Sequence, residues 1–161
     1  METKSVSRIH TLNKVTYINL RWIAIFGQLF TVNIVKYLFD FEFNILFVNF
    51  VISLGAVSNL FLTYFYEKNI LSNRASLIFL LIDIFQLSLI LYFAGGILNP
   101  FSIFLLIPSI FSSSNLEFRT SLFLIIITII SIIFLSLFYQ ELGYPYGAEM
   151  KINTFYYYGV P

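Results

Sequence analysis

The sequence of 161 residues contains no cysteine and only one histidine, His10. The absence of cysteine excludes disulfide bonds and thiolate metal sites within these residues. A metal site at His10 would need further ligands at a suitable spacing, and the neighbouring sequence supplies none. We therefore expect no metal site in this chain.

Charged residues are also scarce. They make up 11% of the chain, against roughly 25% in typical soluble domains. The nine basic and eight acidic residues give a net charge of +1 and are scattered between apolar segments. Because they form neither a basic stripe nor an acidic block, we expect no nucleic-acid partner and no acidic disordered tail.

The chain is instead rich in apolar residues, which make up 59% of it, with aromatic residues at 20%. The apolar runs continue around the whole circumference of a helix, so they lack the polar face of a soluble helix. About 20 apolar residues are needed to cross the hydrocarbon layer. We expect an all-α, polytopic transmembrane helix bundle, with five spans at residues 20–39, 43–66, 75–94, 101–118 and 120–139.

The basic residues predict how the spans are oriented, because Lys and Arg near span ends favour the cytoplasmic side. Four of them precede or open the first span, Lys68 and Arg74 lie between spans two and three, and Arg119 lies between spans four and five. Lys36 is the exception to this pattern. The N-terminus is therefore expected in the cytoplasm, and it shows no pattern of a cleaved signal peptide.

These expectations divide the chain into three parts. Residues 1–19 are a cytoplasmic lead-in, 20–139 a five-span membrane domain, and 140–161 an extracytoplasmic tail. The tail carries an aromatic cluster at 155–158, of the kind found where a chain re-enters a membrane. We expect a fragment cut before a sixth helix. The alternative is a complete protein whose aromatic tail lies on the membrane surface.

Polar residues occur at similar depth in the first three spans. Asp83 is the first to explain, because an ionisable group in the membrane is costly unless it faces protein or water. Gln86 lies one turn away, and Gln28 and Asn59 lie at a comparable depth in spans one and two. We expect an intramembrane polar layer of Gln28, Asn59, Asp83 and Gln86. It either joins helices by hydrogen bonds or forms a proton-linked or ligand-linked site.

Two features surround the fourth span. Pro108 is expected to kink it, and serines 112–114 are placed to satisfy the carbonyls that the kink frees. Before it, residues 95–101 read GGILNPF. The glycines permit positive φ and close approach to a ligand, and the Asn99 amide can donate and accept. This turn is either a binding site or only a tight connection between helices.

The order of these segments resembles the membrane sensor of RegB/PrrB-type histidine kinases. The resemblance covers roughly residues 20–116 and includes RWIAIFGQ at 21–28, Asp83, Gln86 with Leu87, Pro108 and its following serines, and above all GGILNPF. In that family a GGxxNPF heptapeptide joins the third and fourth of six transmembrane helices. The membrane domain is associated there with sensing the redox state of ubiquinone.

The resemblance implies a site for a quinone head group formed by Gly95, Gly96, Asn99, Pro100 and Phe101. It also implies a bacterial inner membrane location among lipids, a homodimer through the full-length kinase, and a cognate response regulator. The parent protein would be an ATP-dependent protein histidine kinase, but these residues contain no phosphoacceptor motif, ATP lid or catalytic domain.

Two other classes remain open. A fragment of a multi-span transporter would use the Asp83 and Gln86 region as an intramembrane site, with the Gly-Asn-Pro turn breaking a helix. A structural membrane subunit would use every polar group to hold helices together. The coding sequence downstream of Pro161 would separate these classes, because a kinase, further spans or a stop codon each selects one.

Overall fold

A computed structural model of the chain describes residues 12–140 and Gly143. The aromatic cluster at 155–158 and His10 lie outside these described residues. The described part consists of α-helices and two 3-10 helices, with one pair of two-residue strands. The elements are β1 (Leu12–Asn13), α1 (Lys14–Tyr37), α2 (Ile45–Phe65), β2 (Ile70–Leu71), α3 (Asn73–Phe93), η1 (Gly96–Leu98), η2 (Pro100–Leu105), α4 (Leu106–Asn115) and α5 (Phe118–Leu137).

Within the described residues, four helices are long and apolar enough to cross a membrane, namely α1, α2, α3 and α5. The expectation of a helical membrane bundle is confirmed at this level, but the count of five spans is not. The fourth predicted span is divided into η2 and α4, and α4 has only 10 residues. Pro108 lies in the first turn of α4, where a missing backbone N–H costs little. The segment changes from 3-10 to α-helical geometry at Leu106, ahead of Pro108, and the expected kink at Pro108 stays a prediction.

Polar side chains define where three helices begin. Asn13 accepts hydrogen bonds from the backbone N–H groups of Val15 and Thr16 at the start of α1. Asn44 caps α2 and Ser72 caps α3 in the same way. These caps satisfy N–H groups that have no partner inside the helix. As a result, α1 starts six residues before the predicted span at residue 20.

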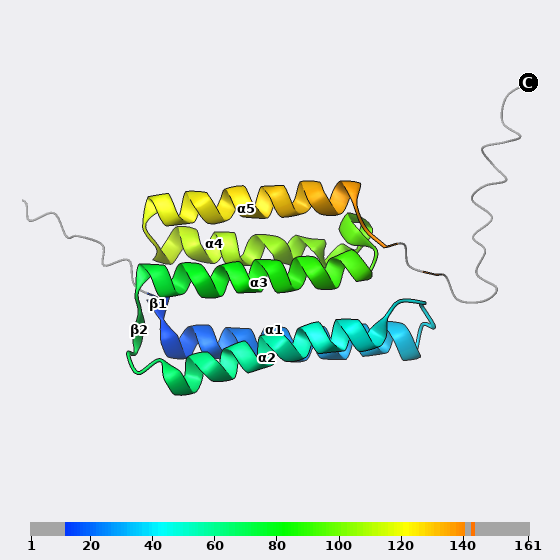
Figure 1. Cartoon of the computed structure of the whole chain (residues 1–161), viewed down its shortest axis with the longest axis horizontal. Helices are drawn as coiled ribbons and strands as arrows, with labels where there is room; N and C mark the ends of the chain where they lie inside the picture. Colours follow the sequence, from blue (N-terminus) through cyan, green and yellow to red (C-terminus); the bar gives the residue numbers. More distant parts are fainter. Residues whose placement is uncertain (1–11, 141–142, 144–161) are drawn as a thin grey trace, which may run out of the picture.

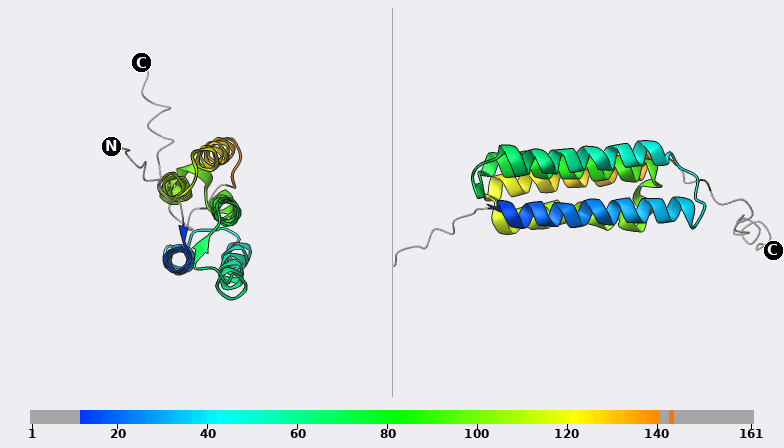
Figure 2. Two further views of the ribbon diagram at one scale, coloured as in Figure 1. Left: turned by 90° about the vertical axis from the view of Figure 1, so that its left-hand side faces the viewer. Right: turned by 90° about the horizontal axis from the view of Figure 1, so that it is seen from below.

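The helices run lengthwise beside one another (Figure 1). Viewed along the helix axes, α1 and α2 form one pair, and α3, α4 and α5 form a second group next to it (Figure 2). The two groups meet where α2 packs against α3, while α4 and α3 both pack against α5. Helix α1 therefore contacts the group of α3, α4 and α5 mainly through its side chains.

One end of the bundle collects four of the six basic residues that lie within residues 12–140. The start of α1, the α2–α3 connection and the start of α5 all lie there (Figure 1). This places Lys14, Lys68, Arg74 and Arg119 at the same end and Lys36 near the other. The Lys14 ammonium donates to the carbonyl oxygens of Thr63 and Tyr66 at the end of α2. It thereby satisfies carbonyls left without partners by the end of that helix.

The same end is tied by a strand pair that the sequence pattern does not indicate. Leu12 pairs with Leu71, and Asn13 pairs with Ile70, in antiparallel register. Leu12 and Leu71 are each only 1% exposed and belong to the core shared with α3. By contrast, large apolar side chains such as Leu46 and Phe118 are exposed on the outside of the bundle. Lipid is the solvent that suits such a surface.

Candidate ligand groove and intramembrane polar network

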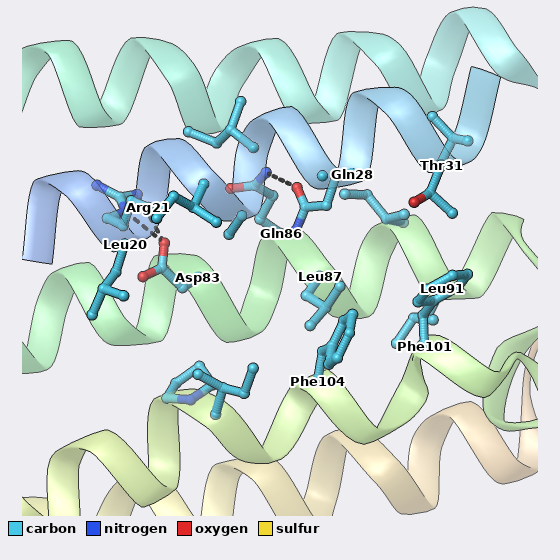
Figure 3. Close-up of a pocket in the computed structure, with 18 of the residues that line it drawn as sticks. Leu20, Arg21, Gln28, Thr31, Asp83, Gln86, Leu87, Leu91, Phe101 and Phe104 are labelled. Carbon is cyan, nitrogen blue, oxygen red and sulfur yellow. Dashed lines mark hydrogen bonds and ion pairs between the residues drawn. The ribbon is translucent and has the colours of Figure 1, made fainter. Parts of the chain in front are cut away.

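A half-open groove of about 590 Å³ lies between α1 and the second helix group. Its walls are α1 on one side, α3 behind, and η2 with α4 on the other side (Figure 3). The rim residues Leu20 and Ile23 of α1, and Phe104 and Ile107 of η2 and α4, are exposed. The groove therefore opens sideways, toward the surface that faces lipid.

A charged network lies at one end of this groove. Arg21 of α1 forms an ion pair with Asp83 of α3, with 2.8 Å between Nη2 and Oδ1, and its Nε donates to the same oxygen at 2.9 Å. The Tyr17 hydroxyl donates to Asp83 Oδ2 at 2.5 Å. Arg21 Nη2 also donates to Ser58 Oγ of α2 at 2.6 Å. The cost of placing Asp83 in the membrane is thus offset by a cation and a hydroxyl.

A pair of amides lies further along the groove. Gln86 Nε2 of α3 donates to Gln28 Oε1 of α1 at 3.2 Å (Figure 3). The Gln86 amide also lies directly against Gly55 of α2, where an added Cβ would come within 2.2 Å of its oxygen. The absence of a side chain at Gly55 is what leaves room for this amide.

The predicted polar layer is brought together only in part. Gln28 accepts a hydrogen bond from Gln86, and Asp83 pairs with Arg21 and accepts from Tyr17, so three side-chain contacts connect α1 to α3. Asn59 is fully buried between α1 and α2, and its Nδ2 donates to the carbonyl of Ile18 at 3.2 Å. It hydrogen-bonds none of the other three. The layer consists of separate contacts rather than one connected network.

The GGILNPF turn closes the other end of the groove. Gly95 and Gly96 have φ of 94° and 62°, a region that favours glycine. Asn99 Nδ2 donates to the Ala94 carbonyl at 2.7 Å, and its Oδ1 accepts from the Phe101 backbone N–H at 2.9 Å. The Asn99 side chain therefore joins the end of α3 to the start of η2.

The five residues predicted as a quinone site do not share one surface. Asn99 and Phe101 line the groove, but Gly95, Gly96 and Pro100 do not. Gly96 instead faces α5, where an added Cβ would lie 2.4 Å from Tyr139 Cβ and 2.9 Å from the Leu135 carbonyl oxygen. The two glycines allow the turn to form and to pack against α5, while Asn99 and Phe101 present their side chains to the groove.

Sequence reasoning missed several groove residues. Phe104 and Phe111 of the fourth segment line it together with Phe101, and Tyr17 contributes from α1. Phe101, Phe104, Pro108 and Phe111 are spaced as residues on one face of a helix. This spacing could have identified the groove residues of the fourth segment from the sequence. For Tyr17 and Ser58 the sequence carried no comparable signal, because their role depends on how three separate helices meet.

Hydrogen bonds between α4 and α5 hold the groove wall in place. Ser109 and Thr128 hydroxyls lie 2.7 Å apart, and Ser121 Oγ donates to the Ser112 carbonyl at 2.8 Å. Ser112 and Ser113 donate to carbonyls within α4, those of Ser109 and Ile110. The serines after Pro108 thus satisfy backbone groups, although these carbonyls are not the ones that the proline frees.

Comparison with known proteins gives one informative similarity. No family profile matches the chain, and no solved structure matches it. The sensor histidine kinase RegB of Cereibacter sphaeroides is 28% identical over 145 residues, which cover 89% of this chain and 31% of that protein. The chain therefore spans about a third of the length of the curated relative it matches. This similarity and the four apolar helices of the described residues support a membrane protein.

Proposed function

We propose that this chain is the membrane sensor portion of a redox-responsive histidine kinase, and that it binds a quinone in the groove between α1, α3 and η2. The observation that carries the proposal is the groove itself. It is mainly apolar, opens toward lipid, and has a few polar groups at defined places on its walls. This combination is typical of sites for small amphiphilic ligands.

The groove offers suitable contacts for both parts of a quinone. Phe101 and Phe104 present aromatic surfaces from η2, and Leu87 and Leu91 face them from α3 (Figure 3). A flat head group packs well against such rings. The exposed rim gives an isoprenoid tail a path into lipid without crossing water. The similarity to RegB, which is a sensor histidine kinase, supports the sensor-kinase part of the proposal.

Signalling requires that the ligand bind two protein states with different affinity. Quinone carbonyls only accept hydrogen bonds, whereas quinol hydroxyls also donate. The groove lies between two helix groups that are joined across it by side-chain contacts from α1 to α3. A change of occupant therefore acts on the spacing between α1 and α3. The kinase core, a homodimer formed through it, and a response regulator belong to the full-length protein in this proposal.

The first test measures quinone binding to the 161-residue chain in lipid nanodiscs, by titration with decylubiquinone. Asn99→Ala removes the link between Ala94 and the start of η2, so the wall that carries Phe101 loses its anchor. We expect weaker binding by about three- to tenfold for both redox forms, from the loss of one or two hydrogen bonds.

Asn115→Ala is the matched control. The Asn115 side chain donates to the Phe111 carbonyl at the far end of α4, so it loses a comparable hydrogen bond away from the turn. We expect its quinone affinity to match that of the unaltered chain. Absence of any saturable quinone binding in well-folded chain would refute the proposed function.

A further inference from the structure

Two arginines lie beside the contact between α3 and α5, at the basic end of the bundle. We propose that Arg74 of α3 and Arg119 of α5 together bind the head group of one anionic phospholipid, whose acyl chains lie along the two helices. Neither residue lines the groove between α1 and α3. The site and its test are therefore independent of quinone binding.

The two arginines lie on the same side of the helix pair. Helices α3 and α5 run parallel, because both begin at the basic end (Figure 1). Asn73 of α3 faces α5, since its Nδ2 donates to Thr120 Oγ1 at 2.6 Å. Arg74 follows this contact by one residue on α3, and Arg119 precedes it by one residue on α5. One step forward on one parallel helix and one step back on the other turn to the same side.

The opposite side of the pair is occupied by α4. Ser121, one residue after Thr120, turns to that side and donates to the Ser112 carbonyl of α4 at 2.8 Å. The view along the helices agrees, because α4 lies on one side of α3 and α5 and no described helix covers the other side (Figure 2). Both arginines are exposed. Their side of the helix pair is therefore open to lipid.

The charges of the two arginines are not neutralised by the protein. Within residues 12–140, neither forms a salt bridge. Glu117 lies in the short connection from α4, and Glu67 follows α2, which packs against α3 on the side away from α5 (Figure 2). Each arginine is also the second residue of its helix, where the positive end of the helix dipole disfavours another positive charge. An anion between them would relieve both effects.

Apolar side chains continue from the arginines into the membrane. Ile78 lies four residues after Arg74, and Phe123 lies four residues after Arg119, so each lies one turn further along the same face of its helix. Ile78 is 56% exposed and Phe123 is 45% exposed. A pair of charges next to exposed apolar surface fits a ligand with an anionic head and hydrocarbon chains. A free phosphate ion would use only the arginines.

The charge of the head group decides which lipid binds. Because α3 and α5 are long enough to span the membrane, arginines in their first turns lie at the depth of the head groups. Guanidinium groups hold phosphate oxygens by charge-assisted, fork-shaped hydrogen bonds. A zwitterionic head group also brings a cation, which the two arginines repel. Each basic residue near the membrane surface contributes about fivefold to the affinity for an anionic lipid.

The experiment is native mass spectrometry of the 161-residue chain, released from micelles that contain phosphatidylglycerol or phosphatidylcholine with the same acyl chains. We expect the chain to retain one phosphatidylglycerol molecule tightly and phosphatidylcholine much less. Arg74→Gln and Arg119→Gln should each weaken the retention of phosphatidylglycerol about fivefold. The double variant should retain the two lipids equally. Both side chains are exposed, so we expect these variants to fold normally.

Lys68→Gln is the matched control. It removes one positive charge from an exposed side chain at the same end of the bundle, but from the connection between α2 and α3 instead of the helix pair. We expect its retention of phosphatidylglycerol to equal that of the unaltered chain.

Four outcomes would overturn the inference. If Lys68→Gln weakened retention as much as the arginine variants, binding would follow total charge alone. Retention of two phosphatidylglycerol molecules, each lost with a different arginine, would show that the arginines do not share one head group. Equal retention of both lipids by the unaltered chain would show that head-group charge does not select the ligand. Retention of inorganic phosphate in place of lipid would assign the arginines to a free anion.

Discussion

At the scale of single residues, the contact between Arg21 and Asp83 changes how the intramembrane carboxylate is understood. From the sequence, Asp83 belongs to a polar layer that either joins helices by hydrogen bonds or forms a proton-linked or ligand-linked site. The structure places Arg21 within 2.8 Å of Asp83, with only 5% of the Arg21 side chain exposed. The guanidinium also packs over the rings of Tyr17 and Phe79. Each charge is thus the main compensation for the other.

We predict that Asp83→Asn destabilises the bundle, because it leaves the buried Arg21 charge without its counter-ion. Loss of one partner from a buried pair costs about 3 kcal/mol or more. The double variant Arg21→Met with Asp83→Leu removes both charges and should recover much of this loss. The measurement is unfolding of each variant in mixed detergent micelles. Equal stability of Asp83→Asn and the unaltered chain would show that the ion pair is unimportant.

At the scale of elements, the turn between α3 and η2 is held from two directions. Asn99 fastens it to the end of α3, and Gly96 seats it on the end of α5 beside Tyr139. The Gln140 backbone N–H also donates to the Tyr92 carbonyl at 2.8 Å, which joins the ends of α5 and α3. The groove wall is therefore rigid where it meets the turn.

Gly96→Ala tests this seat. Gly96 has positive φ and no room for a Cβ, so we predict a loss of at least about 2 kcal/mol in the free energy of unfolding. Gly27→Ala is the matched control, since Gly27 lies within α1 and an added Cβ there meets nothing within 4 Å. It should be neutral or stabilising by about 0.5 kcal/mol. Similar melting temperatures for the two variants would contradict this account of the turn.

The elements also show what the sequence could predict. Long apolar runs predict α2, α3 and α5 within a few residues, because hydrophobic length alone determines a span. The start of α1 was missed, because the charge of Lys14 suggests a residue outside the helix. In the structure, the Lys14 ammonium donates to carbonyl oxygens at the end of α2. The division of the fourth segment into η2 and α4 depends on local backbone geometry that composition does not carry.

The site shows the same limit. The sequence indicated that Gln28, Asp83, Gln86, Asn99 and Phe101 are special, and all five line one groove. It could not show that the Asn99 side chain hydrogen-bonds within the turn, or that the absence of a side chain at Gly55 makes room for the Gln86 amide. Those facts arise from the packing of helices that are distant in sequence.

At the scale of the whole molecule, the two ends of the bundle differ in charge. Lys14, Lys68, Arg74 and Arg119 gather at one end. The rule that basic residues remain inside therefore favours that end for the cytoplasm. We propose that the N-terminus and the α2–α3 connection face the cytoplasm and that the α1–α2 connection faces outward.

The lack of cysteine makes this orientation easy to test, since each introduced thiol is the only one in the chain. Phe39→Cys, in the α1–α2 connection, should react with a membrane-impermeant maleimide in intact spheroplasts. Lys68→Cys, in the α2–α3 connection, should react only after lysis. Both residues are exposed, so burial does not limit the reaction. The reverse pattern would invert the assigned topology.

The sideways opening of the groove has a consequence for how binding is quantified. Because exposed rim residues of α1 and η2 border it on the lipid side, a ligand arrives by diffusion within the bilayer. Its effective concentration is then its mole fraction among lipids, and the aqueous concentration matters only through partitioning. Titration curves measured at two lipid-to-protein ratios should coincide when binding is plotted against moles of ligand per mole of lipid. They should diverge when binding is plotted against moles of ligand per litre. The quantity that the chain responds to is the composition of the membrane itself.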